Sequence, residues 1–209
     1  MPLVAKSAGD GFNFELIPAG NHVARCYMVC DLGEHEQEYQ GQKSIKRKVR
    51  LAFECPDELM SEGDNEGRPF SVSKEYTLSL HEKAALYKDL VGWRGKPFTP
   101  EELDGFDLEN LAGVPCMVNV VHKTSAATGN TYPSITSISK VPKGLTMTDQ
   151  VNDSVIFSTD NPDARDAVLS LPEWLQGKIN LSPISADAAS DAYQQYAEQG
   201  QDLDDDIPF

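Results

Sequence analysis

The sequence lacks the features that mark membrane and secreted proteins. No stretch approaches the roughly 20 consecutive apolar residues that a membrane-spanning helix requires. The N-terminal segment MPLVAKSAGDGFNFELIPAG has no basic start followed by an apolar run and a small-residue cleavage site, so we expect no secretion signal. These absences predict a cytoplasmic protein with no membrane partner.

Cysteine and histidine are sparse. The four cysteines are too few for a disulfide framework and include no Cys-x-x-Cys pair, so buried free thiols are the simplest interpretation. Cys26 and Cys30 lie on a predicted strand, where their spacing in sequence puts them about 13 Å apart, too far to chelate one metal ion. The four histidines are scattered and no nucleophile motif accompanies them. We predict no metal site, no cofactor and no catalytic residue.

Basic residues are scarce for a nucleic-acid-binding protein, with 18 Lys and Arg against 33 Asp and Glu and a net charge of -15. Because phosphate binding depends on Lys and Arg, this balance alone argues against such a partner. The excess acid is unevenly distributed: residues 1–150 carry 16 basic and 21 acidic side chains, and residues 151–209 carry 2 and 12. The asymmetry predicts one folded body with an acidic tail.

Alternation of apolar and polar residues predicts five strands, with a polar loop after the first of them and a turn at TSAATGN that joins the last two as a hairpin. Ser79 and Glu82 have the spacing of a capping box, which predicts a helix between the third and fourth strands. The strands are expected at residues 21–31, 46–54, 70–80, 114–122 and 132–139, and the loop at 32–44.

Three strands, a helix and two further strands follow the connectivity of an oligonucleotide-binding fold (OB-fold), which binds nucleic acid with strands 2 and 3 and the loops 1–2 and 4–5. We therefore predict a mainly β protein with a five-stranded OB-fold barrel over residues 1–141. A small α/β annex is expected over 142–181, where the apolar run Val155–Phe157 and a helix around 164–171 would pack on the barrel. Residues 182–209 are polar and acidic and are expected to be disordered.

A basic cluster on the second predicted strand is the best candidate for following a phosphate backbone. Alternation puts Lys46, Lys48 and Arg50 on one face of that strand. Stacking of a base on an aromatic side chain contributes about 1–3 kcal/mol, so exposed tyrosines near the cluster are further candidates. The simpler alternatives are a solvated sheet edge for the cations and ordinary packing for the tyrosines. The predicted DNA-binding residues are Tyr39, Lys43, Lys46, Arg47, Lys48, Arg50, Lys74, Tyr76, Lys123 and Tyr132.

The chain ends in DLDDDIPF, an acidic run followed by exposed apolar residues that solubility alone does not require. A pocket on a partner would explain this ending, with Phe209 in an apolar hole, its α-carboxylate paired with an arginine and the aspartates along a basic ridge. The alternative is a solvated acidic tail with an accidental apolar end. The predicted partner-binding residues are Asp202, Asp204, Asp205, Asp206, Ile207, Pro208 and Phe209.

DLDDDIPF closely resembles the acidic tip of bacterial single-stranded DNA-binding proteins. That resemblance implies recruitment of exonuclease, helicase, primase, recombination and polymerase subunits through the tip. Residues 79–99, 105–122 and 171–179 resemble a family of small proteins encoded by tailed phages and prophages, several of which are described as single-stranded DNA-binding. This second resemblance covers roughly residues 20–179, and it implies an OB-fold protein in the bacterial host cytoplasm.

We therefore predict a protein, not an enzyme, that binds and protects single-stranded DNA without sequence preference in replication, recombination and repair. Because the acidic tail resembles phosphate, deletion of residues 202–209 is expected to tighten DNA binding. Two alternatives stay open. One is an adaptor or decoy that captures host enzymes through the tip without binding DNA, and the other is a nuclease that the tip directs to its substrate. The sequence leaves homo-oligomerisation and RNA binding open.

Overall fold

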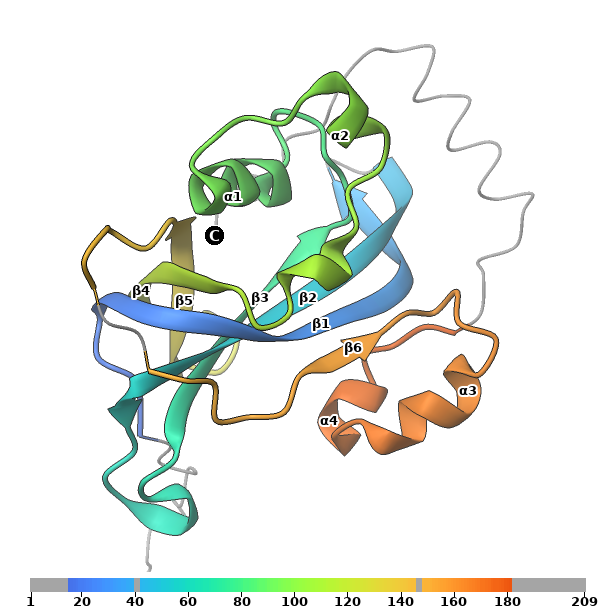
Figure 1. Cartoon of the computed structure of the whole chain (residues 1–209). Helices are drawn as coiled ribbons and strands as arrows, with labels where there is room; N and C mark the ends of the chain where they lie inside the picture. Colours follow the sequence, from blue (N-terminus) through green and yellow to red (C-terminus); the bar gives the residue numbers. More distant parts are fainter. Residues whose placement is uncertain (1–14, 40–41, 146–147, 182–209) are drawn as a thin grey trace, which may run out of the picture.

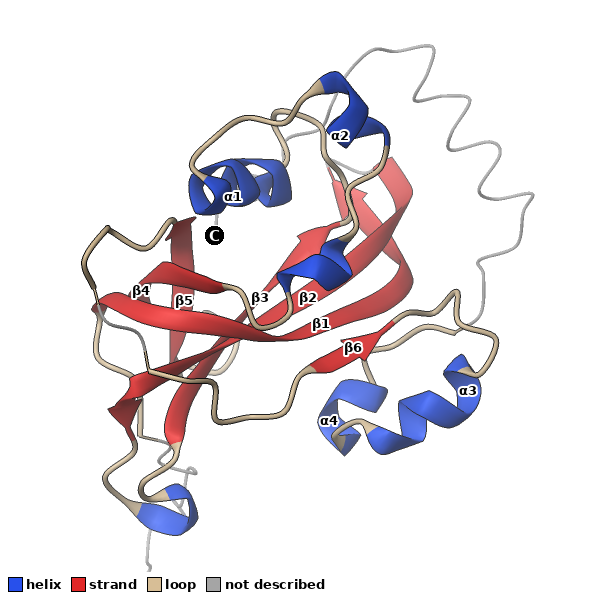
Figure 2. Cartoon of the chain, in the orientation of Figure 1, coloured by secondary structure: helices blue, strands red, loops and turns tan. Residues whose placement is uncertain are grey.

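The computed structural model describes residues 15–39, 42–145 and 148–181. Within these ranges the chain is mainly β, as predicted, with six strands in one sheet, α1 and α2 on one side and α3 and α4 on the other (Figures 1 and 2). The strands are β1 (Gly20–Tyr39), β2 (Gln42–Leu59), β3 (Pro69–Thr77), β4 (Pro115–Thr124), β5 (Thr131–Ser139) and β6 (Val155–Phe157). The helices are α1 (Ala85–Arg94), α2 (Pro100–Asp104), α3 (Ala164–Ala167) and α4 (Glu173–Gln176), with 3-10 turns η1 (Gly63–Asn65), η2 (Leu108–Leu111) and η3 (Val168–Ser170).

The long strand β1 organises the sheet. The strand order is β3-β2-β1-β4-β5 with antiparallel neighbours, and β6 joins β1 in parallel. The first part of β1, Gly20–Arg25, pairs with β4, and the longer part, Arg25–Tyr39, pairs with β2. Met28 of β1 is paired with β2 and also with β6, so β6 lies on the edge of β1 opposite β2. The hairpin predicted for the last two long strands is confirmed as β4 and β5.

The main core lies between the sheet and α1. Val49, Leu51 and Phe53 alternate along β2 and are buried, as the two-residue period predicts. Trp93 of α1 packs edge-on against Phe53, with 5.5 Å between ring centres. A Cβ on Gly92 would lie 2.5 Å from the carbonyl oxygen of Ile138, so only glycine lets α1 approach the end of β5 this closely. This packing holds α1 against one end of the sheet.

A second core lies on the opposite face of β1 and β2. Met28, Cys30 and Leu32 of β1 pack there with Leu175 of α4. The backbone amide of Asn180 donates to the carbonyl of Leu32 at 2.8 Å. Gly33 has a φ of 77°, and a Cβ on it would lie 2.1 Å from the carbonyl oxygen of Asn180, so this crossing requires glycine. Residues 155–181 therefore cover part of the sheet face that carries the basic cluster.

The connection to β6 is anchored by a buried carboxylate. Glu54 of β2 is 0% exposed and accepts hydrogen bonds from the amides of Val151 and Asn152, at 2.7 and 2.8 Å. Arg25 of β1 donates from Nε to the carbonyl of Thr148 at 2.9 Å. Charge-assisted bonds of this kind are about twice as strong as neutral ones. They fix the path of residues 148–152 across the sheet.

The prediction of a loop at residues 32–44 is wrong. β1 continues to Tyr39 and β2 begins at Gln42, so the two strands form a two-stranded ribbon at this end. Glu34 lies opposite Arg47, and Glu38 lies opposite Lys43. Cross-strand pairs of opposite charge stabilise a ribbon that is solvated on both faces. The segment is polar because neither face of this ribbon packs on a core, and its polar sequence was therefore interpreted as a loop.

The predicted capping box at Ser79 and Glu82 is also wrong. Helix α1 begins at Ala85, and its N-cap Ala84 makes no side-chain capping bond. Ser79 Oγ accepts a hydrogen bond from the amide of His81 instead. The predicted helix does lie between the third and fourth strands, but buried Leu86, Leu90 and Trp93 stabilise it rather than its cap.

The four cysteines are buried and free, which confirms the prediction from their number and spacing. Burial raises the pKa of Cys26, Cys30 and Cys55 to about 12. These thiols are therefore protonated at neutral pH and act as small core side chains. No helix in the described ranges is long and apolar enough to span a membrane.

Candidate nucleic-acid interface

Lys46, Lys48 and Arg50 share the face of β2 that points away from the main core, because Val49 and Leu51 point into it. We call this side of β2 and β3 the outer face. In the register of the two strands, Lys48 lies opposite Thr77, and Arg50 lies opposite Glu75. Three of the predicted DNA-binding cations therefore follow one another along one strand.

Arg50 is held flat beneath a tryptophan. Its guanidinium donates from Nη1 to Glu75 at 2.6 Å and from Nη2 to Ser73 Oγ at 2.5 Å. The guanidinium carbon lies 4.8 Å from the ring centre of Trp174 in α4, a cation–π distance. Trp174 is 55% exposed although it contacts Arg50. A large part of the indole therefore stays open to solvent directly above the basic strand.

Lys178 adds a fourth cation. Its Nζ lies 2.8 Å from Oε1 of Glu75, the oxygen that also accepts from Arg50. Burial raises the pKa of Glu75, but the bond and charge of Lys178 and the charge of Arg50 outweigh it, so the pKa lies below its ordinary value. Glu75 is therefore ionised at neutral pH and positions both cations beside Trp174.

Lys43 and Arg47 point to the other face of β2, where acidic side chains meet them. Lys43 Nζ lies 2.9 Å from Glu36. Arg47 Nη2 lies 2.6 Å from Asp31 and 2.7 Å from Asp160. The five predicted cations of β2 thus divide into an outer group of three and an opposite pair that is bound to carboxylates. Arg50 of the outer group is likewise bound to a carboxylate, that of Glu75.

Asp31 binds Arg47 in a cluster of hydrogen bonds that joins several segments of the fold. Its carboxylate accepts from the amide of Gly33 at 2.9 Å, from two nitrogens of Arg47 at 3.2 and 2.6 Å, and from the amide of Thr159 at 3.0 Å. Burial raises the pKa of Asp31, but these bonds lower it more, and the net pKa lies below its ordinary value. The cluster ties β1 and β2 to the segment after β6. The guanidinium of Arg47, which was predicted to contact DNA, is engaged in this cluster.

Tyr76 and Lys74 belong to the attachment of α1. Tyr76 is 2% exposed, and its hydroxyl donates to Asp89 of α1 at 2.8 Å. Lys74 Nζ donates to the same carboxylate oxygen at 2.8 Å. Burial raises the pKa of Tyr76 well above its ordinary value. The prediction that Tyr76 stacks with a base is therefore wrong, because no base can reach its ring, and Lys74 serves as the cation of a structural ion pair.

Lys123 and Tyr132 lie directly opposite each other on β4 and β5. Tyr132 is 41% exposed. Val120 of β4 lies opposite Gly20, the first residue of β1, and Lys123 and Tyr132 lie beyond this point. β2 pairs with the other part of β1, from Arg25 to Tyr39. The structure therefore brings Lys123 and Tyr132 together but at the opposite end of β1 from the outer cations.

Two kinds of predicted site residue cannot be placed by their side chains. Tyr39 ends β1 opposite Gln42, but its side chain is not among those described. The tip, residues 202–209, lies outside the described residues.

Trp174 and Lys178 were not among the predicted site residues, because they reach the basic strand from far along the chain. Lys178 and Glu75 are 103 positions apart in sequence. This segment was predicted to pack on the barrel, and within it Leu171 and Leu175 contribute to the second core. Trp174 directly precedes the buried Leu175 in α4 and so points to another side of this helix, which is the signal that could have identified it.

No cluster of three or more His, Cys, Asp or Glu side chains is placed to hold a metal ion within the described ranges. No protein-family model matches the chain, and no curated protein matches it.

Proposed function

We propose that the protein binds single-stranded DNA across the outer face. The observation that carries this proposal is the exposed indole of Trp174, stacked on Arg50 and flanked by Lys178. Binding of a single strand without sequence preference requires cations along the phosphate path and a flat ring that accepts any base. The outer face offers both within one surface, together with Lys46 and Lys48 farther along β2.

The exposed indole of Trp174 explains why single-stranded DNA would be preferred to duplex DNA. A duplex hides the faces of its bases in the stack, whereas an unpaired base can lie on an exposed indole and gain about 1–3 kcal/mol. Two cations at Glu75, with Lys46 and Lys48 farther along β2, give a modest phosphate affinity, and this favours a ligand that also supplies stacking. The chain's net charge of -15 further disfavours a purely electrostatic mode.

We also propose that the sheet is an OB-fold barrel. In support, β1, β2 and β3 form a meander, β1 is shared with β4, and a helix lies between β3 and β4. β3 and β5, the two ends of the strand order, approach each other, and α1 contacts both. In such a barrel strands 2 and 3 form the nucleic-acid face. These strands carry Lys48, Arg50 and Glu75.

Lys123 and Tyr132 form a second proposed contact, where a strand leaving the outer face would meet the β4–β5 hairpin. The C-terminal tip is proposed to recruit DNA-processing enzymes by C-terminal carboxylate capture, with Phe209 as its apolar anchor. Bacterial exonuclease, helicase, primase, recombination and polymerase subunits are the partners that the resemblance of the tip implies. The protein would then protect exposed strands during replication, recombination and repair and deliver enzymes to them.

One observation favours the adaptor or decoy as a second candidate. Lys43, Arg47, Arg50 and Lys74 all have acidic partners within the fold, so part of the predicted positive charge is balanced inside the protein. A decoy would bind the receptors of the tip and would ignore oligonucleotides.

The two indole N–H signals in the 1H–15N spectrum of the labelled full chain test the proposed site. They belong to Trp93 and Trp174, and the Trp174→Phe variant assigns them. Addition of an oligothymidine should shift or broaden the Trp174 signal and leave the Trp93 signal in place, and a duplex of equal length should do this far less. An unchanged Trp174 signal at saturating oligothymidine would overturn the assignment of the outer face.

A further inference from the structure

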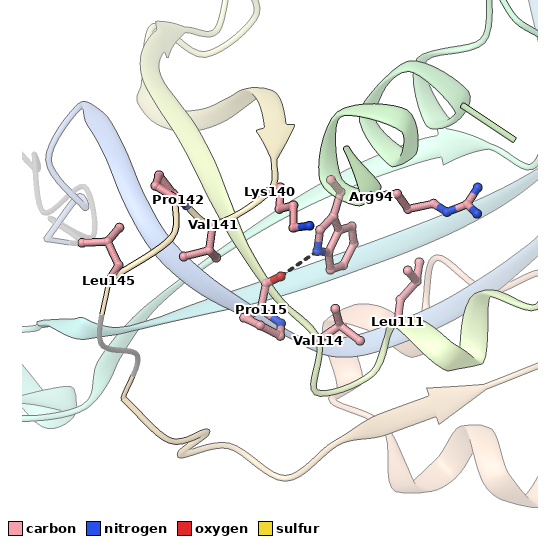
Figure 3. A pocket seen from close by; sticks show the side chains of 9 residues that line it. Arg94, Leu111, Val114, Pro115, Lys140, Val141, Pro142 and Leu145 are labelled. Carbon is pink, nitrogen blue, oxygen red and sulfur yellow. Dashed lines mark hydrogen bonds between the residues drawn. The ribbon is translucent and has the colours of Figure 1, made fainter. Parts of the chain in front are cut away.

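A pocket of about 400 Å³ opens between α1, the start of β4 and the segment after β5 (Figure 3). It lies apart from the outer face and shares none of its residues. Trp93 forms part of its wall, and the indole of this residue donates to the carbonyl of Pro115 at 2.8 Å. The amide of Lys140 donates to the carbonyl of Gly92 at 3.0 Å, which fixes the segment after β5 against α1.

The lining of the pocket is apolar with a basic border. Leu111, Val114 and Leu145 contribute aliphatic surface. The charged residues among the described lining are Lys140 and Arg94, and both are cationic. The side chain of Arg94 points away from the pocket (Figure 3). It pairs with Glu102, and its guanidinium lies 4.1 Å from the ring centre of Phe98. Lys140 is therefore the cation available at the pocket, and exposed Lys143 follows it in the same segment.

We propose that this pocket binds the C-terminal tip of the same chain. Residues 182–209 contain seven acidic side chains and no basic one, and they end in Ile207, Pro208 and Phe209. An apolar end behind a run of aspartates complements an apolar cavity with lysines at its border. Phe209 would enter beside Trp93 and Leu111, and Asp204–Asp206 and the α-carboxylate would lie toward Lys140 and Lys143.

The tail is long enough to reach the pocket. The last described residue is Leu181, and the 28 residues that follow can span about 90 Å at full extension. A domain of this size has a radius of gyration of about 15 Å. A tethered ligand that can reach its site has an effective concentration of up to the millimolar range, so a pocket with a submillimolar dissociation constant is mostly occupied.

Occupation of the pocket gives the tip an internal binding site. A partner enzyme would have to compete with the pocket for Phe209, which would lower its apparent affinity for the tip. Because the pocket and the outer face share no residues, this competition proceeds with or without DNA. The inference therefore stands independently of the proposed DNA binding.

The indole signal of Trp93 tests the inference in the full-length labelled protein. The signal should differ between the native chain and the Phe209→Ala variant, because the variant removes the apolar anchor. Free peptide QDLDDDIPF, titrated into the Phe209→Ala variant, should move the signal saturably toward its native position. No difference between the two chains, together with no response to the peptide, would overturn the proposal.

Two charge-reversal variants distinguish specific binding of the peptide in the pocket from nonspecific attraction to positive charge. Lys140→Glu should weaken peptide binding to the Phe209→Ala chain about tenfold, because it reverses the charge at the border. Lys88→Glu, an exposed lysine of α1 outside the lining, should leave the affinity unchanged. Equal losses in both variants would contradict a specific site. A native Trp93 signal that changes on dilution would assign the pocket to the tip of a second copy and overturn binding within one chain.

Discussion

Arginines serve two purposes along β2. Arg47 is held between Asp31 and Asp160, and it joins the sheet to the segment after β6. Arg50, three positions on, lies under an exposed indole with Glu75 beside it. Residues an odd number of positions apart on a strand point to opposite faces, so the same residue type supports the fold on one face and the proposed binding surface on the other.

Replacement of Trp174 tests the binding surface at one residue. Trp174→Ala should weaken oligothymidine binding by about 1–3 kcal/mol, the usual loss of one stacked base, and Trp174→Phe should lose less. The matched control is Leu169→Ala, which removes a side chain that is 70% exposed in the neighbouring turn η3. Fluorescence anisotropy of labelled oligothymidine gives the affinities. Equal losses for the Trp174→Ala and Leu169→Ala variants would contradict a stacking role.

Replacement of Asp31 tests the structural cluster. Asp31→Asn should lower the free energy of unfolding by about 2–4 kcal/mol at pH 7, because it leaves Arg47 with one exposed acidic partner. Asp160→Asn should cost less than about 1 kcal/mol, since the Asp160 side chain is 75% exposed. Urea unfolding followed by circular dichroism measures both.

The effect of Asp31→Asn on the free energy of unfolding should depend on pH. The pKa of Asp31 in the folded protein lies below its ordinary value, so its stabilising effect is complete above that value and is lost as the pH falls through the folded pKa. The difference in unfolding free energy between the native protein and Asp31→Asn should therefore be constant near neutral pH and shrink below about pH 4. A difference that grows on acidification would contradict the ion-pair assignment.

At the scale of elements, strand β2 determines which cations can follow a phosphate backbone. Lys48→Gln should weaken oligothymidine binding and reduce the slope of log affinity against log salt by about 0.7, the value for one phosphate contact on a single strand. Lys43→Gln should change neither, because Lys43 points to the other face and pairs with Glu36. Anisotropy titrations at several salt concentrations compare the two variants. A larger slope change for Lys43→Gln would contradict the assignment of the two faces.

Elements whose burial alternates in sequence could be predicted, and those without such a pattern could not. The core strands and the helix between β3 and β4 follow from the spacing of residues such as Val49, Leu51 and Leu90. The ribbon at the end of β1 and β2 has no apolar side, so its charged sequence resembles a loop. The true capping box, at Thr99 and Glu102, lies at a short helix that no apolar period indicates. The periodicity of apolar residues therefore predicts elements with a buried face better than elements that are solvated on all sides.

The candidate site was predictable only in the part that lies on one strand. Alternation alone groups Lys46, Lys48 and Arg50. Trp174 and Lys178 reach them through packing of the second core, and no local pattern specifies that long-range contact. The burial of Tyr76 depends likewise on Asp89 of α1. Tertiary contacts decide which of the candidate aromatics is open to a base.

At the scale of the whole molecule, the acidic excess of the tail opposes the cations of the outer face. Deletion of residues 202–209 removes four aspartates and the apolar end. The truncated protein should bind oligothymidine several-fold more tightly at low salt, and the gain should shrink as salt screens the charges. Anisotropy with the full-length and the 1–201 proteins measures the gain. Weaker binding after truncation would contradict electrostatic opposition between the tail and DNA.

The central claim is that the folded body binds single-stranded DNA. Its most direct test is the anisotropy of labelled oligothymidine and of a duplex of equal length, titrated with the full-length protein at low and moderate salt. We predict tighter binding to the single strand than to the duplex, and an affinity for the single strand that falls as salt rises. Absence of binding, or equal binding to both ligands, would contradict the claim, and absence of binding would leave the adaptor or decoy as the function to pursue.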